Sequence, residues 1–455
     1  MDIGVLSKFN PWWSKGAVPP QLLGAHEREV LLDAKKCLDK RFIVLLYGLR
    51  RVGKSTMLYQ IINSLLVGGA KPENILYFSF DEKAAGIGEV ISAYEEMALK
   101  KRIPDAGKVF IFLDEVQKAD DWQGKIKVLY DLNPQLKIFL SGSASISLQK
   151  KSSESLAGRI VDIHVKPLSF SEFAEWKGVK LDASRPEISQ REATPLLMDY
   201  LRKGGFPEIV GEESDDAIRS YLKNTVLERV VLQDLPQEFG LKDVQLLKTL
   251  LEMFCHGPGM IVNVEGISRD LGRNKITVGN YIEHLKYALL ILEVKNFRSS
   301  MIVSSRKNKK IYPASTAFCF AYRDDFFSDA ALQKIAESAV ATHLQARNYY
   351  SNGFEVDFVE RAGSDIFPVE VKYGERDEGQ LKKFMSEFKA KKGVLVSRDI
   401  VSSERMGIRI APLWLFLHEK TEWTGQSQSE ARDKNRDANG GAASGAERRS
   451  RPAAK

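Results

Sequence analysis

Residues 43–56 read IVLLYGLRRVGKST, and this stretch decides the fold that we expect the chain to adopt. The apolar run at residues 43–47 is typical of a short strand that is buried on both faces. Residues 48–55 then match the pattern G-x-x-x-x-G-K-[ST] at every fixed position, and a helical pattern follows over residues 57–66. A strand, a glycine-rich loop and a helix in this order predict a phosphate-binding P-loop rather than a chance glycine-rich turn.

The loop carries the chemistry that a nucleoside triphosphate requires. Gly48 and Gly53 let backbone N–H groups point at phosphate oxygens, and the following helix directs its positive end to the same place. Lys54 supplies a positive charge for the β- and γ-phosphates, and Ser55 supplies a hydroxyl for Mg²⁺. The predicted ATP-binding residues are therefore Gly48, Leu49, Arg50, Arg51, Val52, Gly53, Lys54, Ser55, Thr56 and, from a later strand, Ser141.

A second motif lies at residues 109–115 (VFIFLDE), an apolar strand that ends in two carboxylates, as in the Walker B pattern. P-loop enzymes hold Mg²⁺ with the P-loop hydroxyl and an aspartate at the end of a neighbouring strand, which predicts Asp114 as a metal ligand. Glu115 is expected to polarise the attacking water. The alternative is that the two carboxylates only cap the next helix. The two motifs together predict ATP binding and Mg²⁺-dependent hydrolysis.

Further strands are expected at residues 75–81 and 136–143, and helices at residues 89–100 and 122–133. This alternation predicts right-handed βαβ units and a parallel sheet. Ser141 and Ser143 end one of these strands, where they either sense the γ-phosphate or are plain turn residues. Arg159 is either an arginine finger that reaches a nucleotide or a member of a surface salt bridge.

Composition limits the remaining possibilities. The chain has 455 residues, 44% of them hydrophobic and 28% charged, which predicts several globular domains. No apolar run is long enough for a membrane span, and the N-terminus lacks a secretory signal, so we expect a cytoplasmic protein without a membrane partner. The three scattered cysteines predict neither a disulfide framework nor a metal cluster. A net charge of +7 is compatible with an anionic partner such as DNA.

The middle of the chain has the pattern of a helical lid followed by a winged helix. A helix at residues 196–210 is broken at Gly204-Gly205, and the lid extends to about residue 235. Helices over 241–256, 267–272 and 275–290 and a hairpin over 291–313 then follow the winged-helix order. The residues expected to face DNA are Arg273, Asn274, Lys275 and Thr277 in the recognition helix and Arg298, Arg306, Lys307, Lys309 and Lys310 in the wing. The alternative is that the region serves as an ATPase lid or a protein contact.

The C-terminal half carries the pattern of a second active site. An acidic residue in a strand at 354–359, followed by E-x-K in a strand at 366–372, is the layout of the PD-(D/E)xK nuclease fold. Asp357 and Glu370 are predicted to bind Mg²⁺, and Lys372 to orient the attacked phosphate. Gln380 is a further candidate for this site. The alternative is an ordinary strand with one wet face, because E-x-K alone is a weak motif.

Seven stretches give the chain a family resemblance: LYGLRRVGKSTML, FDE, IFLDEVQKADDWQ, SGSAS, ESLAGR, PLSFSEF and GGFPEIV. They resemble the AAA-type ATPase family of archaea and bacteria, whose P-loop domain carries a winged helix and a C-terminal nuclease-like domain. The resemblance implies that Gly48, Gly53, Lys54, Ser55, Asp114 and Glu115 bind nucleotide and magnesium. It also implies that Glu337, on a helix beginning near residue 335, completes the nuclease-like site. Oligomerisation stays open, because an arginine finger comes from a neighbouring subunit in many AAA+ rings.

The expected fold class is α/β, with an AAA+-like parallel sheet that has helices on both faces. The expected parts are an N-terminal segment (1–25), a P-loop domain (26–175), a helical lid (176–240), a winged helix (241–313), a smaller restriction-endonuclease-like α/β domain (314–423) and a disordered tail (424–455). The leading functional prediction is an ATPase that acts on or with DNA, with nuclease activity in its last domain. The alternative is an ATP-switched module that binds protein or nucleic acid through an inactive nuclease-like domain.

Overall fold

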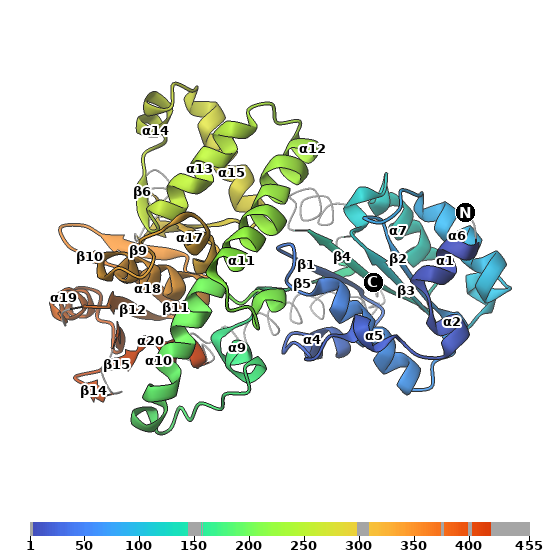
Figure 1. The fold of residues 1–455 in the computed structure, drawn as a ribbon, viewed down its shortest axis with the longest axis horizontal. Coiled ribbons are helices and arrows are strands. Elements are labelled where there is room, and N and C mark those ends of the chain that lie inside the picture. Colours follow the sequence, from blue (N-terminus) through green and yellow to red (C-terminus); the bar gives the residue numbers. More distant parts are fainter. Residues whose placement is uncertain are drawn as a thin grey trace, which may run out of the picture.

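The computed structural model describes residues 3–143, 156, 158–297, 309–374, 377–398 and 403–419 (Figure 1). Three five-stranded sheets follow one another along this part of the chain. The expected C-terminal tail, the SGSAS strand end beyond Ser143 and the tip of the wing lie outside the described residues.

The first sheet is wholly parallel, with the strand order β2-β3-β4-β1-β5. Its strands are β1 (Ile43–Gly48), β2 (Ile75–Ser79), β3 (Val109–Asp114), β4 (Leu136–Ser143) and β5 (Ile160–His164). The carboxyl ends of β1 and β3 flank β4, so residues that follow these two strands meet at one edge of the sheet. The predicted α/β class and the parallel sheet are confirmed.

Helices cover both faces of this sheet, because alternate residues of its strands point in opposite directions. Val44 and Leu46 of β1 pack in the same core as α5 (Lys54–Val67), whereas Ile43 and Leu45 pack with α6 (Ile87–Tyr94) and α7 (Trp122–Leu132). The edge strand β2 is covered by α1 (Ile3–Phe9) and α2 (Trp12–Lys15). The indoles of Trp12 and Trp13 both donate to the carbonyl of Ile75, at 3.1 and 2.9 Å. Covering an edge strand in this way removes a template for pairing with other chains.

A helical region joins the first sheet to the second. It comprises α9 (Phe170–Trp176), α10 (Pro186–Lys203), α11 (Asp215–Ser220) and α12 (Leu235–Phe239). Two π-helical stretches, Tyr221–Leu227 and Val230–Asp234, lie between α11 and α12. These stretches join α11 and α12 into one continuous helix. Asp234 of this helix forms an ion pair with Arg50 of the phosphate loop.

The second sheet begins in the order expected of a winged helix. Helix α13 (Val244–His256), β6 (Met260–Val262), α14 (Val264–Asp270) and α15 (Lys275–Tyr287) precede β7 (Ile291–Asn296) and β8 (Lys309–Pro313). The sheet does not end there, because β9 (Asn348–Ser351) pairs in parallel with β7, and β10 (Glu355–Val356) pairs with β9. This sheet therefore crosses the boundary that we expected at residue 313.

The third sheet has the order β11-β12-β13-β15-β14. Its strands are β11 (Phe358–Ala362), β12 (Asp365–Lys372), β13 (Gly393–Ser397), β14 (Ser403–Arg405) and β15 (Ile408–Pro412). The accompanying helices are α17 (Thr316–Tyr322), α18 (Asp329–Leu344), α19 (Gly379–Phe388) and α20 (Leu413–His418). The strand expected at residues 354–359 is divided at Asp357, where the chain passes from the second sheet to the third.

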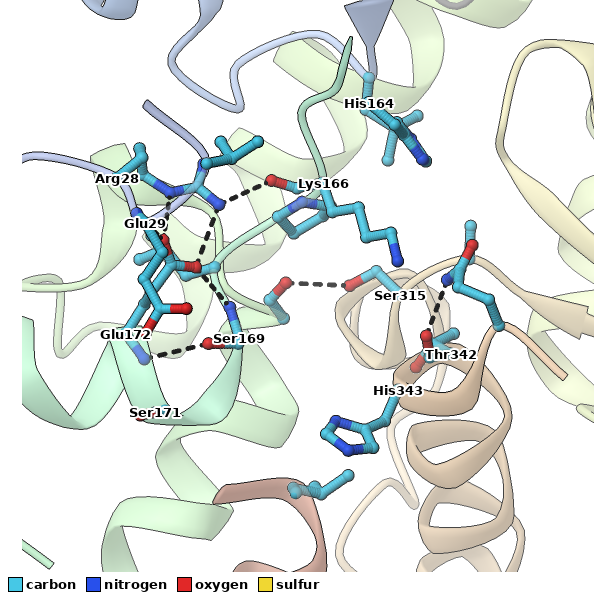
Figure 2. Close-up of a pocket in the computed structure, with 18 of the residues that line it drawn as sticks. Arg28, Glu29, His164, Lys166, Ser169, Ser171, Glu172, Ser315, Thr342 and His343 are labelled. Atoms are coloured by element: carbon cyan, nitrogen blue, oxygen red, sulfur yellow. Dashed lines mark hydrogen bonds and ion pairs between the residues drawn. The ribbon is translucent and has the colours of Figure 1, made fainter. Parts of the chain in front are cut away.

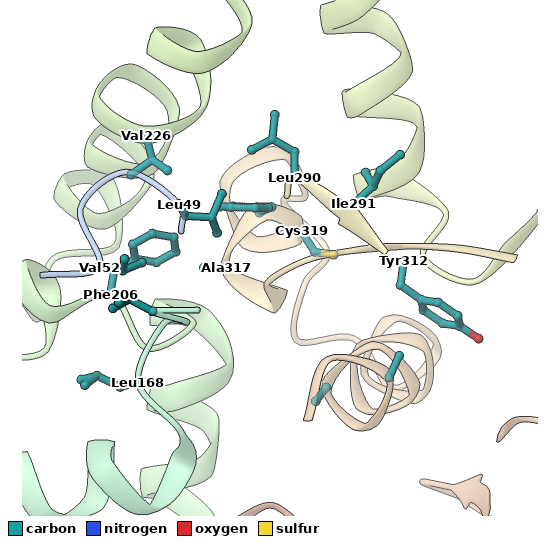
Figure 3. Close-up of a cluster of buried hydrophobic side chains, with 14 of the residues drawn as sticks. Leu49, Val52, Leu168, Phe206, Val226, Leu290, Ile291, Tyr312, Ala317 and Cys319 are labelled. Atoms are coloured by element: carbon teal, nitrogen blue, oxygen red, sulfur yellow. The ribbon is translucent and has the colours of Figure 1, made fainter. Parts of the chain in front are cut away.

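One apolar core joins these regions (Figure 3). Leu49 and Val52 of the phosphate loop belong to the same buried cluster as Phe206, Val226 and Ala317, which come from three later parts of the chain. Buried apolar surface contributes roughly 25 cal/mol per Å², so this shared core resists separation of the regions. No helix among the described residues is long and apolar enough to cross a bilayer. Cys37, Cys255 and Cys319 are buried free thiols.

Candidate functional site at the carboxyl ends of β1 and β3

The phosphate loop connects β1 to α5. A Cβ at Gly48 would overlap the backbone carbonyl of Val165, so only glycine fits where the loop leaves the strand. Gly53 has φ +91°, and Arg51 has φ +64°, which is uncommon for a residue with a side chain. Left-handed backbone conformations of this kind occur frequently at functional sites, where they aim backbone N–H groups at a ligand.

Lys54 is the first residue of α5, and its ammonium group folds back onto the loop. The Nζ atom donates to the carbonyls of Gly48 and Leu49, at 3.2 and 2.8 Å, and only 5% of the residue is exposed. Burial lowers the pKa of Lys54, while the charges of Glu115 and Asp114 act in the opposite direction. An arriving phosphate would offer this buried cation a better partner than two carbonyls.

Ser55 and Asp114 lie in direct contact. The Ser55 hydroxyl donates to Asp114 Oδ2 at 2.5 Å, and the phenol of Tyr77 donates to the same oxygen at 2.9 Å. Ser141 donates to the other carboxylate oxygen, Oδ1. Mg²⁺ prefers oxygen ligands and keeps several waters, so this hydroxyl and carboxylate fit a magnesium ion that is shared with a substrate phosphate.

Glu115 extends from the same strand end with φ +52°. Its backbone N–H donates to Asp114 Oδ1 at 3.1 Å and to Ser141 Oγ at 3.3 Å. Its carboxylate accepts from Gln117 Nε2 at 2.6 Å, and the same amide donates to Ser143 Oγ at 2.9 Å. The carboxylate is therefore held in place beside Asp114 and still has one oxygen for a water molecule.

Arg50 and Arg51 of the loop both form ion pairs with the helical region. Arg50 forms two hydrogen bonds with Asp234, of 2.5 and 2.7 Å, and Arg51 contacts Glu208 at 2.9 Å. These ion pairs fasten the loop to the helical region.

Arg159 lies at the opposite end of the sheet from the phosphate loop. Its carbonyl accepts from the N–H of Ile43, the first residue of β1, and its side chain contacts Asp131 at 3.1 Å. The length of β1 separates the two ends by about 17 Å, at roughly 3.3 Å per residue. Arg159 therefore forms the surface salt bridge and does not reach the phosphate loop of its own chain. A finger supplied to a neighbouring subunit stays a prediction.

Sequence reasoning missed a buried ion pair beneath the loop. Arg28 Nε contacts Glu172 Oε1 at 2.9 Å, and other guanidinium nitrogens donate to the carbonyls of Val52 and Lys166, each at 2.9 Å. Glu172 also completes a capping box with Ser169 at the start of α9. Burial would raise the pKa of Glu172, but the hydrogen bond and charge of Arg28 outweigh it and hold the pKa below its usual value. The stretch PLSFSEF contains both Ser169 and Glu172 and was the only signal in the sequence.

A cavity of about 790 Å³ lies behind the loop, between the first sheet, α10, α18 and α20 (Figure 2). Leu49 lines it, together with Arg28, Lys166, His164 and His343. Burial and the nearby Lys166 charge lower the pKa of each histidine to about 4. Lys54, Ser55 and Asp114 are not among its lining residues, so we do not assign the nucleotide to it.

The predicted nuclease-like residues do come together in the C-terminal half. Lys372 Nζ contacts Glu370 Oε1 at 2.8 Å, and the N–H of Asp357 donates to Glu370 Oε2 at 3.3 Å. Burial, with the charges of Glu337 and Glu370, raises the pKa of Asp357 well above its usual range. Gln380 lies in the first turn of α19.

An ammonium group already lies among these carboxylates. Lys310 of β8 is 2.7 Å from Glu355 Oε1, 3.2 Å from Glu337 Oε1 and 3.9 Å from Asp357 Oδ1. No group of three or more His, Cys, Asp or Glu side chains among the described residues is arranged to hold a metal. The residues present thus do not fit Mg²⁺ in this arrangement, and the predicted nuclease chemistry has no support from the geometry.

Of the basic residues predicted to face DNA, those that the structure describes are also paired with acidic residues. Arg273 contacts Asp243 at 2.7 Å and Lys275 contacts Glu265 at 3.1 Å, while Lys309 contacts Glu293 at 2.8 Å. Asn274 caps α15, and Thr277 lies in that helix's first turn. Arg298, Arg306 and Lys307 lie outside the described residues. Acidic partners reduce the attraction of such a surface for phosphate groups, so DNA binding stays a prediction.

Comparisons with known proteins agree with the first half of this description. Residues 40–174 match a family model described as an AAA domain. Residues 194–324 and 332–416 match models described as domains of unknown function, DUF8612 and DUF4143. The chain therefore contains an AAA-family P-loop ATPase domain, followed by segments that these two models define.

Uncharacterized relatives align with this chain over most of their own sequences. An uncharacterized protein of Haemophilus influenzae is 26% identical over 351 residues, which cover 74% of this chain and 83% of the relative. Uncharacterized protein MJ1637 of Methanocaldococcus jannaschii is 26% identical over 401 residues, 80% of this chain and 82% of the relative. A solved Walker-type ATPase of Pyrococcus abyssi aligns over 66% of this chain and 99% of its own, with 16% identity and a TM-score of 0.40.

Proposed function

We propose that this chain binds ATP at residues 48–56 and hydrolyses it in a Mg²⁺-dependent reaction at the carboxyl ends of β1 and β3. The observation that carries the proposal is the contact between Ser55 and Asp114, with the Lys54 ammonium held in the adjoining loop. Lys54 and Ser55 follow β1 and Asp114 ends β3, so the parallel sheet brings an ammonium, a hydroxyl and a carboxylate to one edge. Magnesium, when bound, would neutralise charge on the β- and γ-phosphates.

Each residue then has a defined task. The backbone of residues 48–53 and the start of α5 receive the phosphates, and Lys54 exchanges its carbonyl partners for phosphate oxygens. Glu115 accepts the proton of the attacking water, with its carboxylate oriented by Gln117. Ser141 fixes Asp114 and the backbone of Glu115, which is a positioning role.

The helical region has a means of responding to the nucleotide. Arg50 is tied to Asp234 and Arg51 to Glu208, so a rearrangement of the loop pulls on elements beyond the first sheet. The salt bridge of Arg50 is largely buried, with 11% of the arginine and 20% of the aspartate side chain exposed. We infer that ATP binding and hydrolysis bias the placement of this helical region.

Two variants separate binding from hydrolysis. Lys54→Ala is expected to abolish ATP binding, because no other ammonium group replaces the lost charge within the loop. Glu115→Gln is expected to retain ATP binding and to lose turnover, because an amide cannot accept the proton. Calorimetric titration with ATP and Mg²⁺, with a phosphate-release assay, measures both. Lys127→Ala, an exposed lysine of α7, is the control and should behave as wild type. Normal turnover in Glu115→Gln would remove Glu115 from the role of general base.

A second candidate function is an ATP-switched interaction module whose nuclease-like part does not cut. The position of Lys310 among the carboxylates favours it, as does the pairing of Arg273 and Lys275 with acidic residues. Incubation of the purified chain with plasmid, Mg²⁺ and ATP, beside Lys372→Ala, distinguishes the two candidates. Cleavage by the wild type that is lost in Lys372→Ala would restore the nuclease prediction. The absence of nicks in every form of DNA supports the module.

A further inference from the structure

Lys310 is among the most deeply buried charged residues of the described chain. Its side chain is 3% exposed, and that of Glu337 is 2% exposed. It reaches the cluster from β8, a strand of the second sheet, whereas the carboxylates belong to α18, β10, β12 and the turn at Asp357. A buried ammonium requires paired charges, and here carboxylates from several elements provide them.

We propose that Lys310 fills the cation position of this carboxylate cluster, so that the cluster fastens β8 to the C-terminal half of the chain and does not bind a divalent ion. The proposal concerns a region remote from the phosphate loop and does not depend on ATP hydrolysis.

The contacts of Glu337 argue for a permanent ammonium site. Lys310 and Tyr312 lie two residues apart on β8 and point to the same side of the strand. Both contact Glu337 Oε1, at 3.2 and 2.6 Å, and Lys334 contacts Oε2 at 2.8 Å. Both oxygens of this carboxylate are therefore already used by donors that belong to the chain.

The charges of the cluster are nearly balanced without a metal. The ammonium groups are Lys310, Lys334 and Lys372, and the carboxyl groups are Glu337, Glu355, Asp357 and Glu370. The separations of 2.7 and 3.2 Å from Lys310 Nζ suit hydrogen bonds from an ammonium group. A Mg²⁺ ion would lie about 2.1 Å from its oxygen ligands, and the Lys310 ammonium occupies the space that the ion would need.

The geometry has a consequence for the fold. Lys310 joins the sheet that contains the winged-helix strands to α18, in addition to the pairing of β7 with β9. Withdrawal of β8 would take Lys310 away from the buried Glu337 and the largely buried Asp357, which is costly. The contact between β8 and the C-terminal half of the chain is therefore stabilised by the same carboxylates that were predicted to form the nuclease-like site.

Titration of Mn²⁺ into the nucleotide-free full-length chain tests the proposal, with the bound ion followed by electron paramagnetic resonance. The wild type should show no Mn²⁺ binding that depends on Asp357. Lys310→Met should gain one Mn²⁺ per chain that the further change Asp357→Asn removes, and Mn²⁺ should raise its melting temperature. Lys334→Met is the matched control, since it removes a half-exposed ammonium from the same carboxylate, and it should resemble wild type.

Either of two results would overturn the proposal. One is Mn²⁺ binding by the wild type that Asp357→Asn abolishes. The other is a Lys310→Met variant that gains no Mn²⁺ and melts no lower than Lys334→Met. If Lys310→Met does not fold, the double variant Lys310→Met/Glu355→Gln removes one charge of each sign and should still gain Mn²⁺ through the remaining carboxylates. Failure of that gain contradicts the proposal in the same way.

Discussion

Arg28 holds the phosphate loop against the rest of its domain. It binds the carbonyl of Val52 within the loop, the carbonyl of Lys166 after β5 and the carboxylate of Glu172 in α9. The pair is buried, with 6% of the arginine and 7% of the glutamate side chain exposed. Removing one partner of such a pair leaves the other charge buried and unpaired, which is more costly than the loss of an exposed pair.

Arg28→Met is therefore expected to lower the free energy of unfolding by about 3–5 kcal/mol. The control is Arg185→Met, because Arg185 pairs with Asp182 at 2.8 Å on an exposed surface, where an ion pair contributes far less to stability. Urea unfolding of the two variants and the wild type measures the difference. Equal losses in both variants would show that Glu172 finds another partner.

Among single residues, the sequence predicted those whose positions follow from the fixed spacing of a motif. Lys54 and Ser55 follow the loop directly, and Asp114 ends a strand that the parallel topology places nearby. Arg28 and Glu172 are 144 positions apart, and neither lies in a pattern that predicts the other. The role of Arg159 could not be predicted either, because its position in the sequence did not reveal at which end of the sheet it lies.

Among the elements, the turn after α10 depends on close backbone contacts. Gly204 has φ +60°, and a Cβ at this position would overlap the Ser315 hydroxyl and Ala317 at the start of α17. Its neighbour Gly205 likewise faces the backbone of Leu168. The glycine pair therefore lets the chain after α10 pass close to Leu168 and to the start of α17. Helix α10 ends at Lys203, so the break that was predicted at Gly204-Gly205 is confirmed.

Gly204→Ala combines two penalties, a left-handed backbone and an overlap with α17. The left-handed conformation alone costs roughly 1–2 kcal/mol for a residue with a side chain. Gly178→Ala isolates this first penalty, because Gly178 has φ +73° and open space around it. Thermal unfolding should show a larger loss for Gly204→Ala than for Gly178→Ala. Equal melting temperatures would mean that α17 moves aside without cost.

The predicted elements were most accurate where apolar runs are long and buried. Residues 43–47 and 136–143 became β1 and β4 with little change. The strand at 354–359 was predicted as one element, yet Asp357 divides it, because its backbone N–H and carboxylate bond to Glu370 and Val371. Those partners come from a strand that follows in the sequence, so local pattern did not indicate the break.

Considered as a whole, the molecule is held together by contacts between regions that resemble separate domains in sequence. The core around Leu49, Phe206 and Ala317 is shared, and the second sheet takes strands from both sides of residue 313. Lys310 was expected on an exposed wing, because lysines near a hairpin tip are usually solvated. The carboxylates that bury it lie 27–47 positions later, and nothing local to β8 indicates them.

The cavity between these regions predicts a pH dependence of stability. The pKa values of His164 and His343 are lowered to about 4, against 6.5 for a free histidine. Below pH 6.5 the unfolded chain binds protons that the native chain excludes, so stability falls as the pH falls. Lowering the pH from 7.5 to 5.5 should reduce the free energy of unfolding by about 1 kcal/mol for each histidine.

Urea unfolding of the wild type and of His164→Asn/His343→Asn at these two pH values measures this effect. The double variant should lose less stability than the wild type over the same interval. An equal loss would place the responsible protons on other groups.

The central claim is that a triphosphate and Mg²⁺ bind where β1 and β3 end, and a crystal structure with a non-hydrolysable ATP analogue and Mg²⁺ tests it most directly. The account predicts that Lys54 leaves the carbonyls of Gly48 and Leu49 for the phosphates, and that the metal lies between Ser55 and Asp114. A structure grown with excess analogue in which this loop is empty, or is filled by side chains of the chain itself, would contradict the account.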